Sequence, residues 1–165
     1  MSEATDKKKQ APATVHVSEG VDRFGESRRT FGMPIIYKVA PSDTNGDLFI
    51  IENITPHKGG PPRHLHYEQE EWFYVVEGEY IIEVGEQEYR LKSGDSLLAP
   101  RGIPHVWANV GEATGKLLIV FQPAGQMEAF FQAMAQLQGP PSREELAPLF
   151  QAHGMELTGP PLNVS

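Results

Sequence analysis

The feature that most constrains the fold is a series of short β-rich segments between residues 33 and 123. Valine, isoleucine, phenylalanine and tyrosine are concentrated in these segments, and glycine, proline, asparagine and aspartate separate them. No helical pattern interrupts the series, which argues against a parallel α/β sheet and favours an all-β antiparallel sandwich or barrel. The segments lie at 33–40, 47–55, 71–78, 79–85, 87–94, 95–100, 105–110 and 115–123.

Three of these segments indicate how their strands are covered or paired. The run "EWFYVVEG" at 71–78 is nearly continuous in apolar residues, which is typical of a strand covered on both faces. Residues 79–85 and 87–94 flank a short turn at Gly85, so we expect them to form a hairpin.

The pattern changes after residue 123. Apolar residues recur at helical spacing between 124 and 139, and a capping-box sequence, Ser142 with Glu145, begins a second helical segment that ends at Gly154. We therefore predict a β domain over 15–125 and a helical extension over 126–165 that packs on the barrel or on a partner. Residues 1–14 are polar and lack periodicity, and we predict that they are disordered.

Composition excludes several classes of protein. The 165 residues include no cysteine, which rules out thiolate metal sites, cysteine nucleophiles and disulfides. The net charge of −8 argues against nucleic acid as a partner. No apolar run is long enough to span a bilayer and no secretion signal opens the chain, so we expect a cytoplasmic protein without a membrane partner. The length favours one domain.

Two histidines one residue apart, His64 and His66, precede Glu71. Side chains alternate between the faces of a strand, so the two imidazoles would point the same way. The four residues between His66 and Glu71 are enough to turn the chain back toward them. One metal ion would explain this grouping, but an isolated His-x-His pair is a weak signal and is more often solvated or hydrogen-bonded than part of a metal site.

A second stretch, "GDSLLAPRGIPHVWAN" at 94–109, strengthens the metal hypothesis. Pro100, Gly102 and Pro104 define a sharp, rigid turn that places His105 at the start of the next strand. A lone histidine there would more often be a packed core residue. Beside a His-x-His pair and a glutamate, it is a candidate fourth ligand.

The two stretches resemble the two conserved motifs of the cupin superfamily. The first motif departs from the family at its opening glycine, where this chain has Lys58, followed by Gly59 and Gly60. The second motif matches throughout. The matching residues are His64, His66, Glu71 and Gly78 in the first motif, and Gly94, Pro100, Gly102, His105 and Asn109 in the second.

The resemblance implies a cupin jelly-roll β-barrel, also called a double-stranded β-helix, in a single-domain protein that is often a homodimer. It also implies that His64, His66, Glu71 and His105 hold one divalent transition metal per chain inside the barrel. Imidazole and carboxylate ligands suit Fe, Mn, Ni, Co, Cu or Zn without choosing among them.

The barrel interior is the expected substrate pocket. Phe73 and Val75 share a strand face with Glu71, and Trp107 shares one with His105, so these three residues are its predicted walls. The alternative is that the aromatic residues only fill a narrow core. We assign no role to the remaining histidines, which are His16, His57 and His153.

The chain further resembles quercetinase-type cupins, which are metal-dependent dioxygenases. That resemblance implies a small aromatic or enolic substrate, with Glu71 serving as ligand and as catalytic proton acceptor. Two alternatives stay open at this point. One is a non-catalytic cupin that binds or senses a small molecule, and the other is an isomerase or decarboxylase that uses the metal as a Lewis acid. A sugar-nucleotide epimerase is a weaker alternative.

Overall fold

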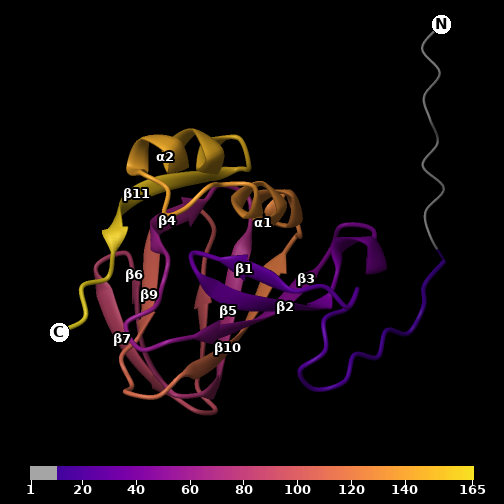
Figure 1. Ribbon diagram of the computed structural model, residues 1–165, viewed down its shortest axis with the longest axis horizontal. Coiled ribbons are helices and arrows are strands. Elements are labelled where there is room, and N and C mark those ends of the chain that lie inside the picture. The colour runs from indigo at the N-terminus through magenta and orange to yellow at the C-terminus, as the bar shows by residue number, and fades with distance from the viewer. Residues whose placement is uncertain (1–10) are drawn as a thin grey trace, which may run out of the picture.

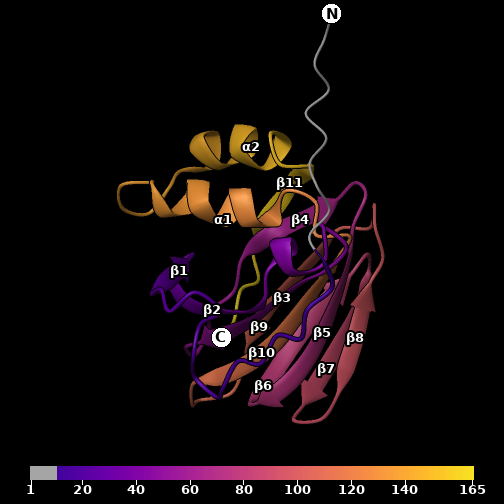
Figure 2. The same cartoon turned by 90° about the vertical axis from the view of Figure 1, so that its right-hand side faces the viewer.

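A computed structural model describes residues 11–165 of the chain. The β-rich segments form two antiparallel sheets that face each other as the walls of a barrel, as Figures 1 and 2 show. One sheet has six strands in the order β1-β2-β3-β10-β5-β8, and the other has five in the order β11-β4-β9-β6-β7. The predicted jelly-roll class is therefore confirmed. The first ten residues of the tail predicted to be disordered lie outside the described part of the chain.

The strands agree closely with the predicted segments, and the predicted hairpin is β6 and β7, paired from Glu79↔Lys92 to Val84↔Gln87. The strands are β1 Arg28–Thr30, β2 Met33–Val39, β3 Phe49–Thr55, β4 Pro62–His66, β5 Glu70–Glu77, β6 Glu79–Val84, β7 Gln87–Lys92, β8 Ser96–Ala99, β9 His105–Asn109, β10 Gly115–Gln122 and β11 Met155–Pro161.

Strand β5 departs from the expectation of burial on both faces. Glu71, Phe73 and Val75 point into the barrel and are buried, whereas Trp72 and Tyr74 on the other face are only partly covered and stack on each other. The strand therefore alternates between faces, and its apolar run reflects aromatic residues on an outer surface. Large aromatic residues can occupy such a half-exposed face because they favour the pleated backbone.

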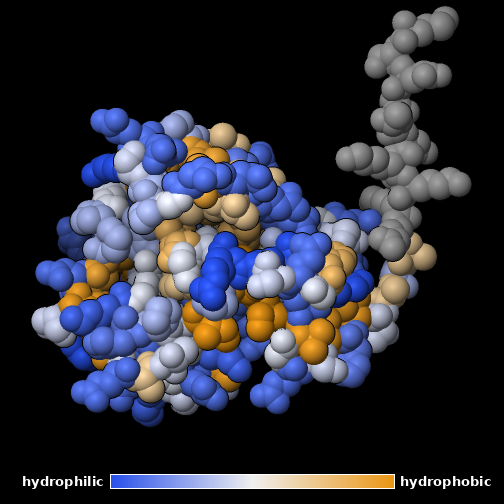
Figure 3. Space-filling model, in the orientation of Figure 1, coloured by the Kyte–Doolittle hydropathy of each residue, from blue (hydrophilic) through white to orange (hydrophobic). Residues whose placement is uncertain are grey.

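Two helices, α1 (Met127–Ala135) and α2 (Arg143–Gln151), confirm the predicted helical segments. Ser142 Oγ accepts from the Glu145 amide at 3.2 Å, and the Glu145 carboxylate accepts from the Ser142 amide at 2.7 Å, so the predicted capping box forms. Both helices lie across one end of the barrel, and Figure 3 shows hydrophilic side chains on their outward surface. No helix within residues 11–165 is long and apolar enough to cross a membrane.

The C-terminal part of the chain differs from the predicted helical extension over 126–165. Its residues Met155–Pro161 form strand β11, which pairs antiparallel with β4 and completes the five-stranded sheet. After α2 ends at Gln151, the chain enters this strand through Gly154, which has a φ of +76°. The residues after α2 therefore belong to the barrel wall beside the two histidines of β4.

Candidate metal centre

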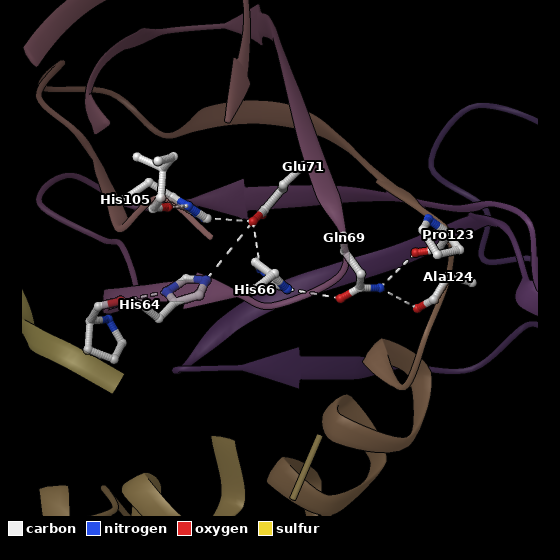
Figure 4. A network of polar contacts seen from close by, with 9 residues as sticks. His64, His66, Gln69, Glu71, His105, Pro123 and Ala124 are labelled. Carbon is white, nitrogen blue, oxygen red and sulfur yellow. Dashed lines mark hydrogen bonds and ion pairs between the residues drawn. The ribbon is translucent and has the colours of Figure 1, made fainter. Parts of the chain in front are cut away.

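Three strands bring the four predicted ligands together inside the barrel. Strand β4 supplies His64 and His66, β5 supplies Glu71, and β9 supplies His105, as Figure 4 shows. One ligand atom from each residue lies within 4.8 Å of the others. All four side chains are buried, with at most 6% of any residue exposed. The grouping predicted from the sequence is therefore present in the fold.

Local geometry explains the convergence. His64 and His66 are two residues apart on β4 and so share its inward face, and His64 is the cross-strand partner of His105. Gly102, in the turn before His105, adopts a φ of +75°, and its amide donates to the His66 carbonyl at 2.7 Å. The turn between β8 and β9 is thereby fixed against the strand that carries the other two histidines.

The outer nitrogen of each imidazole faces a protein acceptor. With the proton on Nδ1, each imidazole donates to this acceptor and leaves Nε2 as a lone-pair donor directed inward, which is the tautomer that a metal ion requires. The Nδ1 contacts are from His64 to the Pro62 carbonyl at 2.8 Å, from His66 to Gln69 Oε1 at 2.9 Å, and from His105 to the Ile103 carbonyl at 3.4 Å.

Gln69 is a functional residue that the sequence analysis missed. Its amide nitrogen donates to the carbonyls of Pro123 and Ala124, at 2.7 Å each, so its oxygen must face His66. An acceptor that orients a histidine ligand in this way is typical of metal sites. Its position between His66 and Glu71 was the available signal, but no local rule distinguishes this glutamine from one in a solvated turn.

The inner nitrogens converge on one carboxylate oxygen. Glu71 Oε2 lies 2.9 Å from His66 Nε2, 2.7 Å from His105 Nε2 and 4.0 Å from His64 Nε2. A proton on Nε2 or a metal ion between the groups accounts for these short distances. Three neutral imidazoles and a carboxylate are the donor set of a divalent transition metal, so these residues fit such an ion.

The charge states of the free residues agree with this assignment. Burial, together with the nearby His105 and His66 rings, lowers the pKa of His64 to about 3, so this imidazole is neutral at physiological pH. Burial alone would raise the pKa of Glu71, but the adjacent His105 and His66 outweigh it and hold that pKa below its usual range. Glu71 is therefore an ionised carboxylate, ready to act as a ligand.

A small cavity of about 40 Å³ adjoins the cluster. Glu71 and His64 form one part of its lining, and Trp107 lines it as predicted. Phe73 and Val75, also predicted to line the pocket, instead fill the core behind it and are fully buried, because Phe73 packs edge-on against the rings of His105 and Trp107.

Both C-terminal helices contribute to this cavity. Phe130 and Phe131 of α1 and Phe150 of α2 line it, and the Phe150 ring centroid lies 5.5 Å from that of His64. The helices therefore close the end of the barrel over the candidate metal centre. The helical spacing of these residues predicted a buried face, but only the fold shows that this face covers the cavity.

The other histidines lie apart from the cluster. His57 is exposed and its Nδ1 contacts the Gly111 carbonyl at 2.6 Å. His153, in the turn after α2, contacts the Leu149 carbonyl of that helix, and His16 is exposed. These positions agree with the absence of an assigned role.

Comparison with known proteins places residues 50–121 in a cupin domain family. Over 85 residues the chain is 34% identical to a quercetin 2,3-dioxygenase of Bacillus subtilis, covering 50% of this chain and 25% of that protein. Over 74 residues it is 30% identical to an uncharacterized protein of Methanocaldococcus jannaschii, covering 45% of this chain and 59% of that protein. The chain thus spans less than two thirds of either relative.

Among solved structures, the chain is similar to an RmlC-like cupin from Shewanella frigidimarina, with a TM-score of 0.55 and 25% identity. That match covers 67% of this chain and 96% of the other, so it includes most of the barrel. The family match, the fold and the two motifs agree: the chain carries a cupin domain at residues 50–121 and resembles the quercetinase-type cupins.

Proposed function

We propose that the chain is a metal-dependent enzyme of the dioxygenase type, acting on a small aromatic or enolic substrate inside the barrel. One observation carries the proposal: three Nε2 atoms and a carboxylate oxygen converge in a buried site while every Nδ1 faces a protein acceptor. The similarity of half the chain to a quercetin 2,3-dioxygenase supports the choice of reaction.

His64, His66, Glu71 and His105 would hold one divalent transition metal, of the group Fe, Mn, Ni, Co, Cu and Zn. When bound, a redox-active metal of this group would supply Lewis-acid activation of a substrate oxygen and electron transfer to dioxygen.

The protein's own groups supply the remaining functions. The ionised Glu71 carboxylate borders the cavity and can accept the proton of an enol or phenol that binds there. The three imidazoles are held in fixed orientations by their Nδ1 hydrogen bonds. The phenylalanines of α1 and α2 make the cavity apolar and exclude bulk water from the reacting group.

Metal content tests the site. Protein purified without chelators should contain about one equivalent of transition metal per chain, and the double variant His64→Ala with His105→Ala should contain none. A matched control is His57→Ala with His153→Ala, which removes two histidines outside the cluster and should keep the metal. Retention of the metal by the first double variant would refute the site.

Oxygen uptake tests the reaction. Protein loaded with Fe, Mn or Ni should consume dioxygen when a diketone or flavonol from a broad panel is added, and the cluster variant should not. Uptake with none of the metals would exclude a dioxygenase. Turnover under nitrogen would instead identify a Lewis-acid isomerase or decarboxylase.

A second candidate function is binding or sensing of a small molecule without turnover. The small volume of the cavity and the helices that cover it support this alternative, because a narrow site favours retention of a ligand. A ligand that co-purifies unchanged would favour it over catalysis.

We also propose that two copies of the chain associate as a homodimer, which sedimentation analysis would measure.

A further inference from the structure

The cavity beside the metal centre contains polar groups that no residue of the described chain satisfies. The hydroxyl of Thr30 is buried and has no hydrogen-bond partner within residues 11–165. No hydrogen bond within residues 11–165 is donated by the amide nitrogen of Asn53 or the indole nitrogen of Trp107, although only the Thr30 hydroxyl is fully enclosed without a partner in this cavity. All three residues line the cavity and are at most 5% exposed. A buried hydroxyl without a partner, such as that of Thr30, is rare in folded proteins because it is costly.

The orientation of Asn53 follows from a chain of hydrogen bonds through the barrel interior. The Tyr80 hydroxyl donates to Thr55 Oγ1 at 2.9 Å, and the Thr55 hydroxyl donates to Asn53 Oδ1 at 2.7 Å. All three residues are at most 1% exposed. Because the oxygen of Asn53 accepts the hydrogen bond from Thr55, the NH2 group is the part of the side chain that can donate to a ligand in the cavity.

A second buried asparagine in the same barrel provides a contrast. Asn109 donates to the carbonyls of Thr55 and Ala113 at 2.9 Å each and accepts from the Gly111 amide at 2.9 Å. Every polar group of Asn109 is therefore used by the fold. The unused donor of Asn53 is specific to the residue that lines the cavity.

We propose that Asn53, Trp107 and Thr30 form a subsite that binds a carbonyl oxygen of the ligand, whose other end faces His64 and Glu71. Two nitrogen donors and a hydroxyl require an acceptor, and no cationic side chain lines the cavity to neutralise a carboxylate. The ligand is therefore a small, largely apolar compound with a neutral carbonyl group at this end. This assignment rests on the proposed function in one respect, namely that the cavity is the substrate site.

Two probes of the same shape test the subsite: cyclohexanone, and methylenecyclohexane, in which a CH2 group replaces the carbonyl oxygen. Both are larger than the cavity of about 40 Å³, so each must displace the lining side chains, and to the same extent. The full chain, labelled with nitrogen-15 and supplied with Zn²⁺, which has no redox chemistry, is titrated with each. Cyclohexanone should shift the indole N–H signal of Trp107 and the side-chain amide signals of Asn53 downfield, as a new hydrogen bond does, whereas methylenecyclohexane should cause only the smaller shifts of a packing contact. A Trp72→Phe variant assigns the two indole signals.

Thr30→Val supplies the second arm, because it replaces the hydroxyl with a methyl group of similar size. It should weaken cyclohexanone binding about three- to tenfold and leave methylenecyclohexane binding unchanged or tighter. The matched control is Thr158→Val. The hydroxyl of Thr158 is also buried without a partner among residues 11–165, but Thr158 does not line the cavity, so neither affinity should change.

Three results would overturn the subsite: no binding of cyclohexanone, binding without shifts at Trp107 and Asn53, or an equal effect of Thr30→Val on both probes. These results are separable from failure of the proposed function, because the titration requires no turnover. Absence of oxygen uptake with intact cyclohexanone shifts would reject the dioxygenase and keep the subsite. Oxygen uptake without those shifts would reject the subsite alone.

Discussion

Replacing Gln69 with leucine should weaken metal binding through a residue that is not itself a ligand. The change removes the acceptor of the His66 Nδ1 proton and the donor to the carbonyls of Pro123 and Ala124. Ala124 keeps a bond from the Met127 amide, and the contact to Pro123 is only partly buried, so water can replace it. The buried Nδ1–H of His66 therefore carries most of the loss.

The magnitude follows from these contacts. One unsatisfied buried donor costs about 1–3 kcal/mol, and the lost bonds to the two carbonyls add about 1 kcal/mol, so the free energy of unfolding should fall by about 2–4 kcal/mol. Without its acceptor the His66 ring also loses its fixed orientation and tautomer. Removal of such a partner lowers metal affinity by about 10- to 100-fold.

Competition between the protein and a chromophoric chelator for Zn²⁺ measures the affinity, and denaturant unfolding of the metal-free chain measures the stability. The control is Gln151→Leu, because Gln151 makes only an exposed contact to the Tyr67 hydroxyl and should leave both values unchanged. If Gln69→Leu lowers stability but leaves the Zn²⁺ affinity at the wild-type value, the orienting role assigned to Gln69 is wrong.

Three further predictions concern residues around the site. Gly60→Ala should destabilise the fold by about 3 kcal/mol in denaturant unfolding, because a Cβ atom there would lie 2.0 Å from the Trp107 carbonyl oxygen. Metal-free protein should lose about 2 kcal/mol of stability between pH 8 and pH 5, because His64 stays neutral in the fold with a pKa of about 3 while the unfolded chain takes up a proton near pH 6.5. This contribution is present above pH 6.5 and lost as the pH falls, and His64→Asn should remove it. Phe150→Ala should cost about 3–5 kcal/mol and admit larger ligands, because its ring packs on Phe130 and lines the cavity.

The ligand cluster was predictable because local rules fix it. Alternation along a strand places His64 and His66 on one face, and a turn of glycine and proline directs His105. The strands were predictable for the same reason, since turn residues mark their ends. The resemblance to the two cupin motifs supplied the remaining information, namely that His105 lies beside His64 although the two residues are some forty positions apart.

The features that could not be predicted depend on contacts distant in sequence. Strand β11 contains Gly159 and Pro160 and shows no alternation, and it forms because β4 offers an edge with which it can pair. Phe73 faces inward as expected, but it packs against the rings of His105 and Trp107 and does not line the cavity. The spacing of residues along a strand predicts which face of the sheet a side chain occupies. It does not predict which of the inward-facing side chains line the cavity.

The closed end of the barrel bears on substrate size. A three-ring flavonol does not fit a cavity of about 40 Å³, so binding one requires α1 and α2 to move away from the barrel. Such a movement would expose at least the buried rings of Phe130 and Phe150, at about 1.5–3 kcal/mol each. A total of about 3–6 kcal/mol would keep the open state below about 1% of the population and weaken flavonol binding by about 10²- to 10⁴-fold. A compact carbonyl compound requires less rearrangement and can use the donors of Asn53 and Trp107, so the structure favours a substrate much smaller than a flavonol.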